Sequence, residues 1–86
     1  MTFAEGLGAN LKEARVALGM TQTDVARRLC ITPPCISQYE TARRMPSLET
    51  TAMLAWVYGV TLDDLVPVRP VEENVDDSQM TFEEAI

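Results

Sequence analysis

The chain contains no histidine and only two cysteines, Cys30 and Cys35. A structural zinc ion takes four protein ligands, so two thiolates alone do not make a metal site. A glycine-rich phosphate loop is also missing, as is a nucleophile paired with a base, and helix capping is a sufficient role for the adjacent Asp63 and Asp64. These absences predict a protein that holds no metal or cofactor and is not an enzyme.

Long apolar runs are missing as well. No stretch approaches the roughly 20 apolar residues of a membrane-spanning helix, and no charged-then-apolar signal segment begins the chain. We therefore expect a cytoplasmic protein without a membrane partner, in which both thiols are reduced. Two small, partly buried side chains are the simplest interpretation of Cys30 and Cys35, and a redox switch between them is the alternative.

The formal charge of −6 is unevenly distributed along the chain. All seven basic residues lie within residues 1–70, where seven acidic residues balance them, and the other six acidic residues lie within 71–86. This length and pattern predict one neutral domain, residues 1–70, and a flexible acidic tail, residues 71–86. Net acidity argues against a nucleic-acid partner, but a neutral domain remains able to bind DNA.

Helix signals recur at short intervals in the first half of the chain. Apolar residues spaced by three and four, followed by Gly19 as a stop, predict a helix over about 3–18. Thr21 and Asp24 form a capping-box pattern that predicts a helix over 22–29. Thr32 is a good N-cap and Pro33 suits the first helical position, so a third helix is expected over 33–40. The apolar face of the first helix comprises Phe3, Leu7, Leu11, Ala14 and Leu18.

Two further helices are predicted after residue 46. Ser47 is the cap of the fourth, which Gly59 ends, and Thr61 with Asp64 caps a short fifth helix that stops before Pro67. Nothing alternates convincingly at period two, so the expected fold class is all-α with five helices. The inward face predicted for the fourth helix comprises Leu48, Thr51, Leu54, Ala55 and Tyr58.

Residues 22–40 have the spacing of a helix-turn-helix, because two short helices flank a three-residue connection at 30–32. Further residues at fixed spacing strengthen the pattern. They are Gly19-Met20-Thr21-Gln22, Val25-Ala26, Ile31-Thr32, Ile36-Ser37, Glu40, Arg44, Pro46-Ser47, Leu54-Ala55 and the run 59–65. Over roughly residues 7–66 the chain thus resembles the lambda-type repressor and Cro family, also called Xre-like.

This resemblance implies a compact five-helix, lambda-repressor-like DNA-binding domain, here followed by a short acidic C-terminal tail. Helix 33–40 is then expected in the major groove of a double-stranded DNA operator, usually in a homodimer. The implied function is sequence-specific regulation of transcription, with repression preferred. The alternative is an antitoxin-like or antirepressor-like adaptor whose acidic tail engages a basic protein partner.

The candidate DNA contacts follow from side-chain chemistry and from the resemblance. Gln22 lies at a helix start, where the free N–H groups and the dipole favour a phosphate. The amide of Gln38 can pair with adenine, and adjacent guanidiniums suit phosphate oxygens. Two successive prolines lack N–H donors and favour apolar contact or shape readout at that end. The full predicted set is Gln22, Thr32, Pro33, Pro34, Ser37, Gln38, Arg43 and Arg44.

Further expectations follow from positions that depart from the family pattern or match it. Cys30 and Ala42 stand where the family commonly has glycine, so both are expected to adopt a positive φ. Met53 and Trp56 stand at usually polar positions, and with Leu62 and Val66 they are expected to form a dimer contact or additional core. Arg15 and Glu40 match a buried ion pair that ties the first helix to the end of the third.

Overall fold

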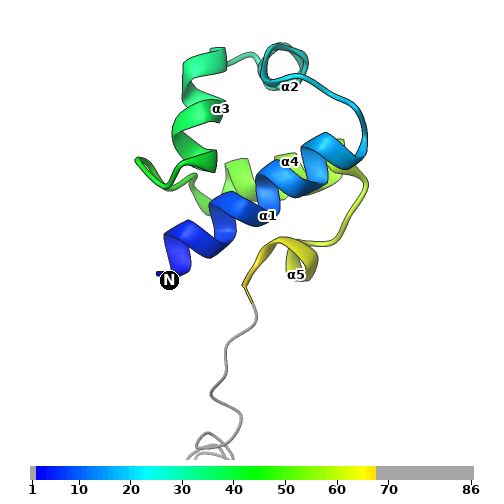
Figure 1. Cartoon of the computed structure of the whole chain (residues 1–86). Coiled ribbons are helices and arrows are strands. Elements are labelled where there is room, and N and C mark those ends of the chain that lie inside the picture. The colour runs from blue at the N-terminus through cyan, green and yellow to red at the C-terminus, as the bar shows by residue number, and fades with distance from the viewer. Residues whose placement is uncertain (1, 68–86) are drawn as a thin grey trace, which may run out of the picture.

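The computed structural model describes residues 2–67 as five α-helices, and no strand occurs in that range. The helices are α1 (Phe3–Ala17), α2 (Gln22–Leu29), α3 (Pro33–Glu40), α4 (Leu48–Tyr58) and α5 (Leu62–Leu65), as shown in Figure 1. The all-α prediction is confirmed, and each helix begins and ends within about one residue of its predicted position. The acidic tail, and the boundary predicted at residue 70, lie outside the described residues. None of the described helices is long and apolar enough to cross a membrane.

Side chains placed just before the helices determine where most of them begin. Thr21 Oγ1 accepts a hydrogen bond from the backbone N–H of Asp24 at 3.0 Å, and the Asp24 carboxylate accepts one from the N–H of Thr21 at 2.9 Å. Thr61 and Asp64 form the same capping box, as predicted. These hydrogen bonds stabilise the charged carboxylates, so the pKa values of Asp24 and Asp64 are lowered.

The start of α3 differs from this pattern. Thr32 occupies the N-cap position, as predicted, but its hydroxyl makes no capping hydrogen bond. The reason is that Pro33 and Pro34 have no N–H to donate, while the N–H of Cys35 bonds to the backbone oxygen of Thr32 at 3.0 Å. The exposed Thr32 hydroxyl therefore remains available at the N-terminus of α3.

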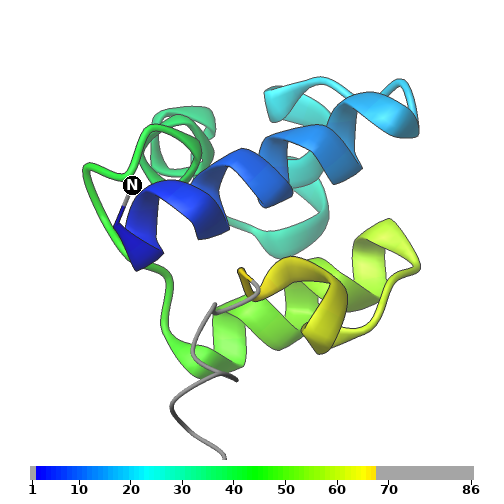
Figure 2. The same ribbon diagram turned by 60° about the horizontal axis from the view of Figure 1, so that its bottom comes forward.

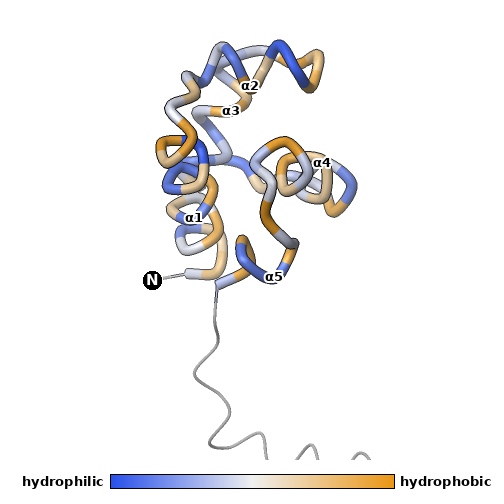
Figure 3. Tube along the Cα trace, turned by 90° about the vertical axis from the view of Figure 1, so that its right-hand side faces the viewer, coloured by the Kyte–Doolittle hydropathy of each residue, from blue (hydrophilic) through white to orange (hydrophobic). Residues whose placement is uncertain are grey.

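The core gathers apolar residues from all five helices around α4. In Figure 2 α1 lies above α4 and α5, and Figure 3 shows apolar and polar residues interleaved along α1, α2 and α4, as expected for helices that bury one side. The amide Nδ2 of Asn10 also donates to the backbone oxygen of Leu65 at 2.8 Å, which ties α5 to α1. The buried apolar residues are Leu7, Leu11, Val25, Ala26, Leu29, Ile36, Leu54, Ala55, Tyr58 and Leu65.

The predicted inward faces are wrong at the helix ends. Leu48, assigned to the inward face of α4, is 75% exposed, and Phe3 and Leu18 at the two ends of the first helix are 44% and 53% exposed. Periodicity assigns a residue to a helix face, but a terminal turn has fewer neighbours to cover it than a central turn. The predicted positions Leu7 and Leu11 of α1, and Leu54 and Tyr58 of α4, are buried as expected.

Two non-glycine residues adopt the left-handed conformation that the sequence predicts for them. Cys30 has φ 59° and ends α2, and Ala42 has φ 64° just beyond α3. A side chain at a positive φ costs about 1 kcal/mol or more, so both turns require support from surrounding contacts. At Ala42 the backbone folds back, and the N–H groups of Arg43 and Arg44 both reach the carbonyl oxygen of Gln38, at 2.9 and 3.2 Å.

Candidate nucleic-acid interface

One exposed side of α3, with the loop after it, carries half of the predicted DNA contacts. The residues Pro34, Ser37, Gln38, Thr41 and Arg43 line a hollow of about 390 Å³ on it. The opposite side packs inward through Ile36, which is buried, and Tyr39, which contacts the core. The structure therefore brings four of the eight predicted residues together on one surface.

Thr41 belongs to this surface and is missing from the predicted set. Its hydroxyl donates to the carbonyl oxygen of Ser37 at 2.9 Å, which closes the last turn of α3. Residues 34, 37, 38 and 41 are spaced by three, four and seven, so they share one helix face. That spacing was present in the sequence and predicts Thr41 as a neighbour of Gln38.

Arg43 and Arg44 are connected to this side of α3 through backbone hydrogen bonds. The backbone N–H groups of Arg43 and Arg44 both donate hydrogen bonds to the carbonyl oxygen of Gln38, which fix the two backbone positions. Both side chains are exposed. The backbone of Arg43 and Arg44 is thus held next to the last turn of α3. The geometry couples a side chain suited to a base with two guanidiniums suited to phosphates.

Gln22 lies beside the C-terminal end of α3, and not beside its proline-bearing start. Its amide Nε2 donates to Glu40 Oε1 at 3.0 Å, which fixes the orientation of the amide group. A primary amide nitrogen has two hydrogens, so one donor remains for a second acceptor. The start of α2 therefore presents an oriented N–H together with the first backbone N–H groups of the helix, which have no intrahelical partner.

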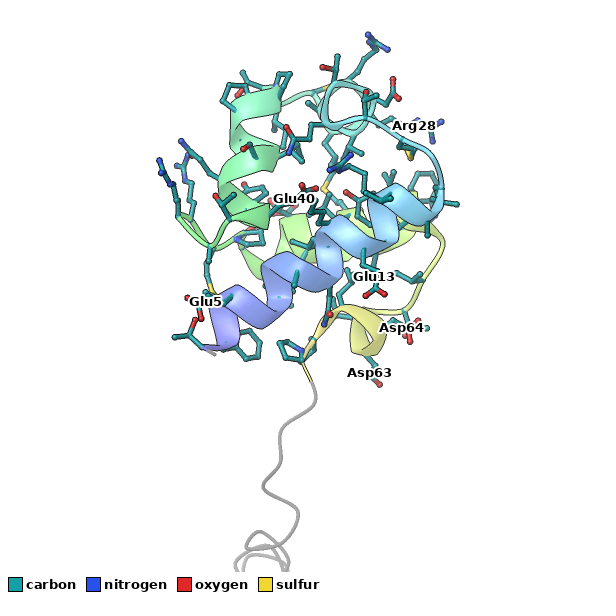
Figure 4. The ribbon with its side chains drawn as sticks, viewed as in Figure 1. Glu5, Glu13, Arg28, Glu40, Asp63 and Asp64 are labelled. Carbon is teal, nitrogen blue, oxygen red and sulfur yellow. The ribbon has the colours of Figure 1, made fainter. Side chains whose placement is uncertain are left out.

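Glu40 is the centre of a buried polar cluster that joins α1, α2 and α3 (Figure 4). Arg15 binds it in a bidentate manner, with Nε to Oε2 at 2.7 Å and Nη2 to Oε1 at 3.1 Å. The two side chains are only 11% and 3% exposed, so the predicted buried ion pair is confirmed. Arg15 Nη1 also donates to the backbone oxygen of Met20 at 2.8 Å. The hydrogen bonds that Arg15 donates to the Glu40 carboxylate raise the pKa of Arg15 despite its burial.

Tyr58 of α4 lies next to this cluster. Its hydroxyl is buried and has no hydrogen-bond partner among the described residues. Burial, together with the negative charge of Glu40, raises the pKa of Tyr58 to about 12, although the positive charge of Arg15 acts in the opposite direction. The folded protein therefore keeps this phenol neutral at pH values where an exposed tyrosine ionises.

We predict that Tyr58→Phe changes the free energy of unfolding at pH 7 by less than about 1 kcal/mol, because the hydroxyl that it removes has no partner to lose. At higher pH the parent should weaken relative to the variant. The unfolded phenol ionises near pH 10, whereas the folded one holds its proton until about 12, so stability is complete below pH 10 and falls as the pH rises through 12.

Melting curves of both proteins at pH 8, 10 and 11.5 would measure this difference. Tyr39→Phe provides a comparison, since it removes the hydroxyl of the only other tyrosine of the chain. A loss of more than about 1 kcal/mol at pH 7 for Tyr58→Phe would show that the Tyr58 hydroxyl has a partner.

The apolar surface predicted from four residues divides into two separate hollows. Met53 and Trp56 lie in the Trp56 groove, a hollow of about 300 Å³ lined by Arg28, Leu29, Glu49, Ala52, Met53, Trp56 and Val57. Leu62 and Val66 lie in the α5 hollow, about 230 Å³, lined by Phe3, Leu7, Met45, Pro46, Leu48, Thr51, Leu62 and Val66. Met53 and Trp56 are separated from Leu62 and Val66, because α4 presents residues 53 and 56 on a different side from residues 48 and 51.

Within residues 2–67 no group of three or more histidine, cysteine or acidic side chains is arranged to hold a metal ion. Cys30 is exposed and Cys35 is half-buried, and both are free thiols. Arg27 and Arg28 are exposed on α2, where Arg27 lies 3.8 Å from Asp24. Among the described residues, the candidate DNA-binding side chains on α3 and the Arg15–Glu40 cluster beside them are therefore the main features of the site.

Known proteins are similar to this region both in sequence and in fold. The family model described as helix-turn-helix matches residues 11–65. The HTH-type transcriptional regulator DdrOP3 of Deinococcus deserti is 41% identical over 56 residues, which cover 65% of this chain and 43% of that protein. The HTH-type transcriptional regulator ImmR of Bacillus subtilis is 40% identical over 60 residues, 70% of this chain and 47% of that protein. The match therefore spans less than half the length of these relatives.

Solved structures extend the comparison to three dimensions. The DNA-binding domain of BldD superposes with a TM-score of 0.70 and 28% identity, over 78% of this chain and all of that domain. HppE, crystallised with Fe(II) and a substrate, superposes with a TM-score of 0.72 and 25% identity, but over only 34% of its own length. The same helical fold thus also occurs as one part of a larger protein of another kind. Since the family model covers more than half of the chain, the protein belongs to the helix-turn-helix family, of the lambda-repressor-like (Xre-like) type that its sequence resembles.

Proposed function

We propose that the protein represses transcription by binding a double-stranded DNA operator, with α3 in the major groove. The observation that carries this proposal is the hollow on α3, where Gln38 lies beside Ser37 and its backbone carbonyl tethers Arg43 and Arg44. A base-reading side chain and two phosphate-binding side chains are then held in one fixed relation. An operator on the chromosome places the protein in the cytoplasm, as the composition also indicates.

The two ends of α3 would meet DNA differently. At the N-terminal end, Pro33 and Pro34 offer apolar surface without N–H donors, so they favour contact with a thymine methyl, while the uncapped Thr32 hydroxyl is available for a phosphate. In the middle, Gln38 presents an amide that can pair with N6 and N7 of adenine, and Ser37 serves either a base or a phosphate.

Phosphates on both sides of the groove complete the proposed contact. Gln22, oriented by Glu40, supplies its second amide hydrogen at the start of α2. Arg43 and Arg44 supply guanidiniums from the loop after α3. Arg15 neutralises Glu40, so the carboxylate that orients Gln22 does not repel the phosphate at full charge.

We further propose that two copies bind the operator as a homodimer through the α5 hollow. Its lining includes Met45 and Pro46, which directly follow Arg44 in the chain, so the hollow adjoins the phosphate-binding loop. A dimer contact in this place leaves both α3 helices facing one side of the DNA, as a two-fold operator requires. Phe3, Met45 and Leu48 are each between 44% and 75% exposed in the single chain and would be covered.

The adaptor function considered from the sequence depends on the acidic tail and therefore on residues outside the described range. No contact among residues 2–67 favours it over DNA binding. Any protein partner of the tail would act in addition to the operator.

Substitution of a residue proposed to contact a base should affect DNA binding differently from substitution of one proposed to contact a phosphate. We expect Gln38→Ala to weaken binding to the preferred operator by about 1 to 3 kcal/mol and to relax the preference at one base pair. Arg44→Ala should instead weaken all DNA sequences alike and reduce the slope of log K against log salt by about one, because it removes one phosphate contact. Selection of operators from random DNA, followed by salt titrations on the selected sequences, measures both quantities.

Lys12→Ala is the matched control, since it removes one exposed positive charge from α1 and leaves α3 unchanged. It should retain both the base preference and most of the salt slope. If Gln38→Ala kept the full base preference of the parent, α3 would not read DNA through that side chain. If Lys12→Ala reduced the slope as much as Arg44→Ala, the effect would come from total charge and not from a contact.

A further inference from the structure

The Trp56 groove has no role in the DNA contact or in the dimer contact proposed above. Trp56 is 81% exposed, more than any other large apolar side chain of the described residues, and Met53 beside it is 44% exposed. Exposed apolar surface of this kind, with an aromatic residue at its centre and polar residues around it, marks a site of association.

Two opposite charges lie at the edges of this groove. Arg28 comes from the last turn of α2 and Glu49 from the first turn of α4, and both are exposed. Among the described residues the ion pairs are Arg15–Glu40 and Arg27–Asp24, so neither Arg28 nor Glu49 is paired within the chain. The groove therefore presents one unpaired base and one unpaired acid together with apolar side chains.

We propose that the Trp56 groove binds the same groove of a second copy of this chain. In a two-fold contact a residue that meets another across the interface is met by it in return. Arg28 of one copy then faces Glu49 of the other, Glu49 faces Arg28, and both tryptophans and methionines lie between the two pairs. The lining is complementary to itself in charge as well as in hydrophobicity.

This contact is distinct from the operator dimer. The α5 hollow adjoins the loop after α3, whereas the Trp56 groove is formed where α2 ends, ahead of the start of α3. Figure 4 shows Arg28 at the α2 end of the molecule, well separated from Glu5 at the start of α1. A contact on this side links one operator-bound pair to the next, so it provides for cooperative binding at neighbouring operators.

The tryptophan itself reports on the contact, because Trp56 is the only one in the chain. We expect its emission to shift to shorter wavelength as the concentration of the full chain rises, with the oligomer growing in sedimentation over the same range. Dimerisation through the α5 hollow leaves Trp56 exposed and produces no such shift. The two contacts, and the success or failure of the proposed operator dimer, are thus distinguishable in one titration.

Charge reversal tests the pairing. Arg28→Glu places two acids opposite each other in both halves of the contact, and Glu49→Arg places two bases there, so each variant alone should associate on the order of tenfold more weakly than the parent. A mixture of the two variants restores an acid opposite a base in both halves. The mixture should show the emission shift in the concentration range of the parent, whereas either variant alone should need on the order of tenfold more protein.

Arg27→Glu is the matched control, because Arg27 is adjacent on α2 and does not line the groove. It should associate like the parent, and circular dichroism should show all variants folded. Failure of the mixture to recover the shift would overturn the proposal. An emission already at short wavelength at every dilution, but shifted to long wavelength on deletion of residues 68–86, would overturn it too, since the groove would then bind the tail of its own chain.

Discussion

Arg15→Ala is expected to lower the free energy of unfolding by about 3 to 5 kcal/mol, because it leaves the Glu40 carboxylate buried without its partner. At about 4 to 8 °C of melting temperature per kcal/mol for a domain of this size, that loss would place the variant close to unfolding at growth temperature. The bidentate geometry and the 3% exposure of Glu40 make this a buried pair and not a surface one. Thermal and urea denaturation of the purified variant measure the effect.

Two comparisons separate the stranded charge from other causes. Arg27→Ala removes an exposed pair, in which the nitrogen and oxygen atoms are 3.8 Å apart, and should change stability by no more than about 0.5 kcal/mol. The double variant Arg15→Met with Glu40→Leu replaces both charges by apolar groups and should recover most of the loss. A double variant as unstable as Arg15→Ala would mean that the hydrogen bonds to Met20 and Gln22, and not the stranded charge, account for the instability.

The helix boundaries were predictable because their causes are local. A threonine three residues before an acid, or a glycine after an apolar stripe, is a signal within one turn of chain, and Thr21, Thr61 and Gly59 all act where the sequence places them. The positive φ at Cys30 and Ala42 was predictable for a different reason, since the resemblance identifies positions that usually hold glycine. Thr2 and Glu5 form an equally local capping box at the start of α1, which the prediction of that helix did not include.

The arrangement of the candidate site was only partly predictable. The periodicity of α3 indicates which residues share its exposed side, but it says nothing of Gln22, whose partner Glu40 is 18 residues away. In the same way, which hollow Leu48 and Trp56 each line depends on where α5 and α2 pack against α4. Contacts between distant segments are set by the tertiary packing, and local sequence patterns do not encode them.

The contact between distant segments on which we expect stability to depend most is the approach of α3 to Gly8 of α1. Gly8 lies in the middle of α1, where glycine is usually unfavourable by about 0.5 to 1 kcal/mol relative to alanine. Here the backbone of α3 approaches so closely that a Cβ atom on residue 8 would lie 2.6 Å from the carbonyl oxygen of Tyr39 and 2.7 Å from that of Glu40. Both atoms belong to the backbone, so neither can swing aside as a flexible side chain would. The absence of a side chain at residue 8 is what permits α1 and α3 to pack at this distance.

Gly8→Ala should therefore lower the free energy of unfolding by about 3 kcal/mol, at the upper end for overpacking, although helix propensity alone predicts a gain. Because the displaced carbonyls belong to the last turn of α3, the variant should also bind the operator more weakly through Glu40 and the arginine loop. Ala9→Gly, at the exposed neighbouring position, gives the propensity effect alone and should lose about 1 kcal/mol without altering operator affinity per folded molecule. Denaturant titration and operator binding of both variants test the argument. If Gly8→Ala gained as much stability as Ala9→Gly lost, α1 and α3 would have to lie farther apart in solution than in this structure.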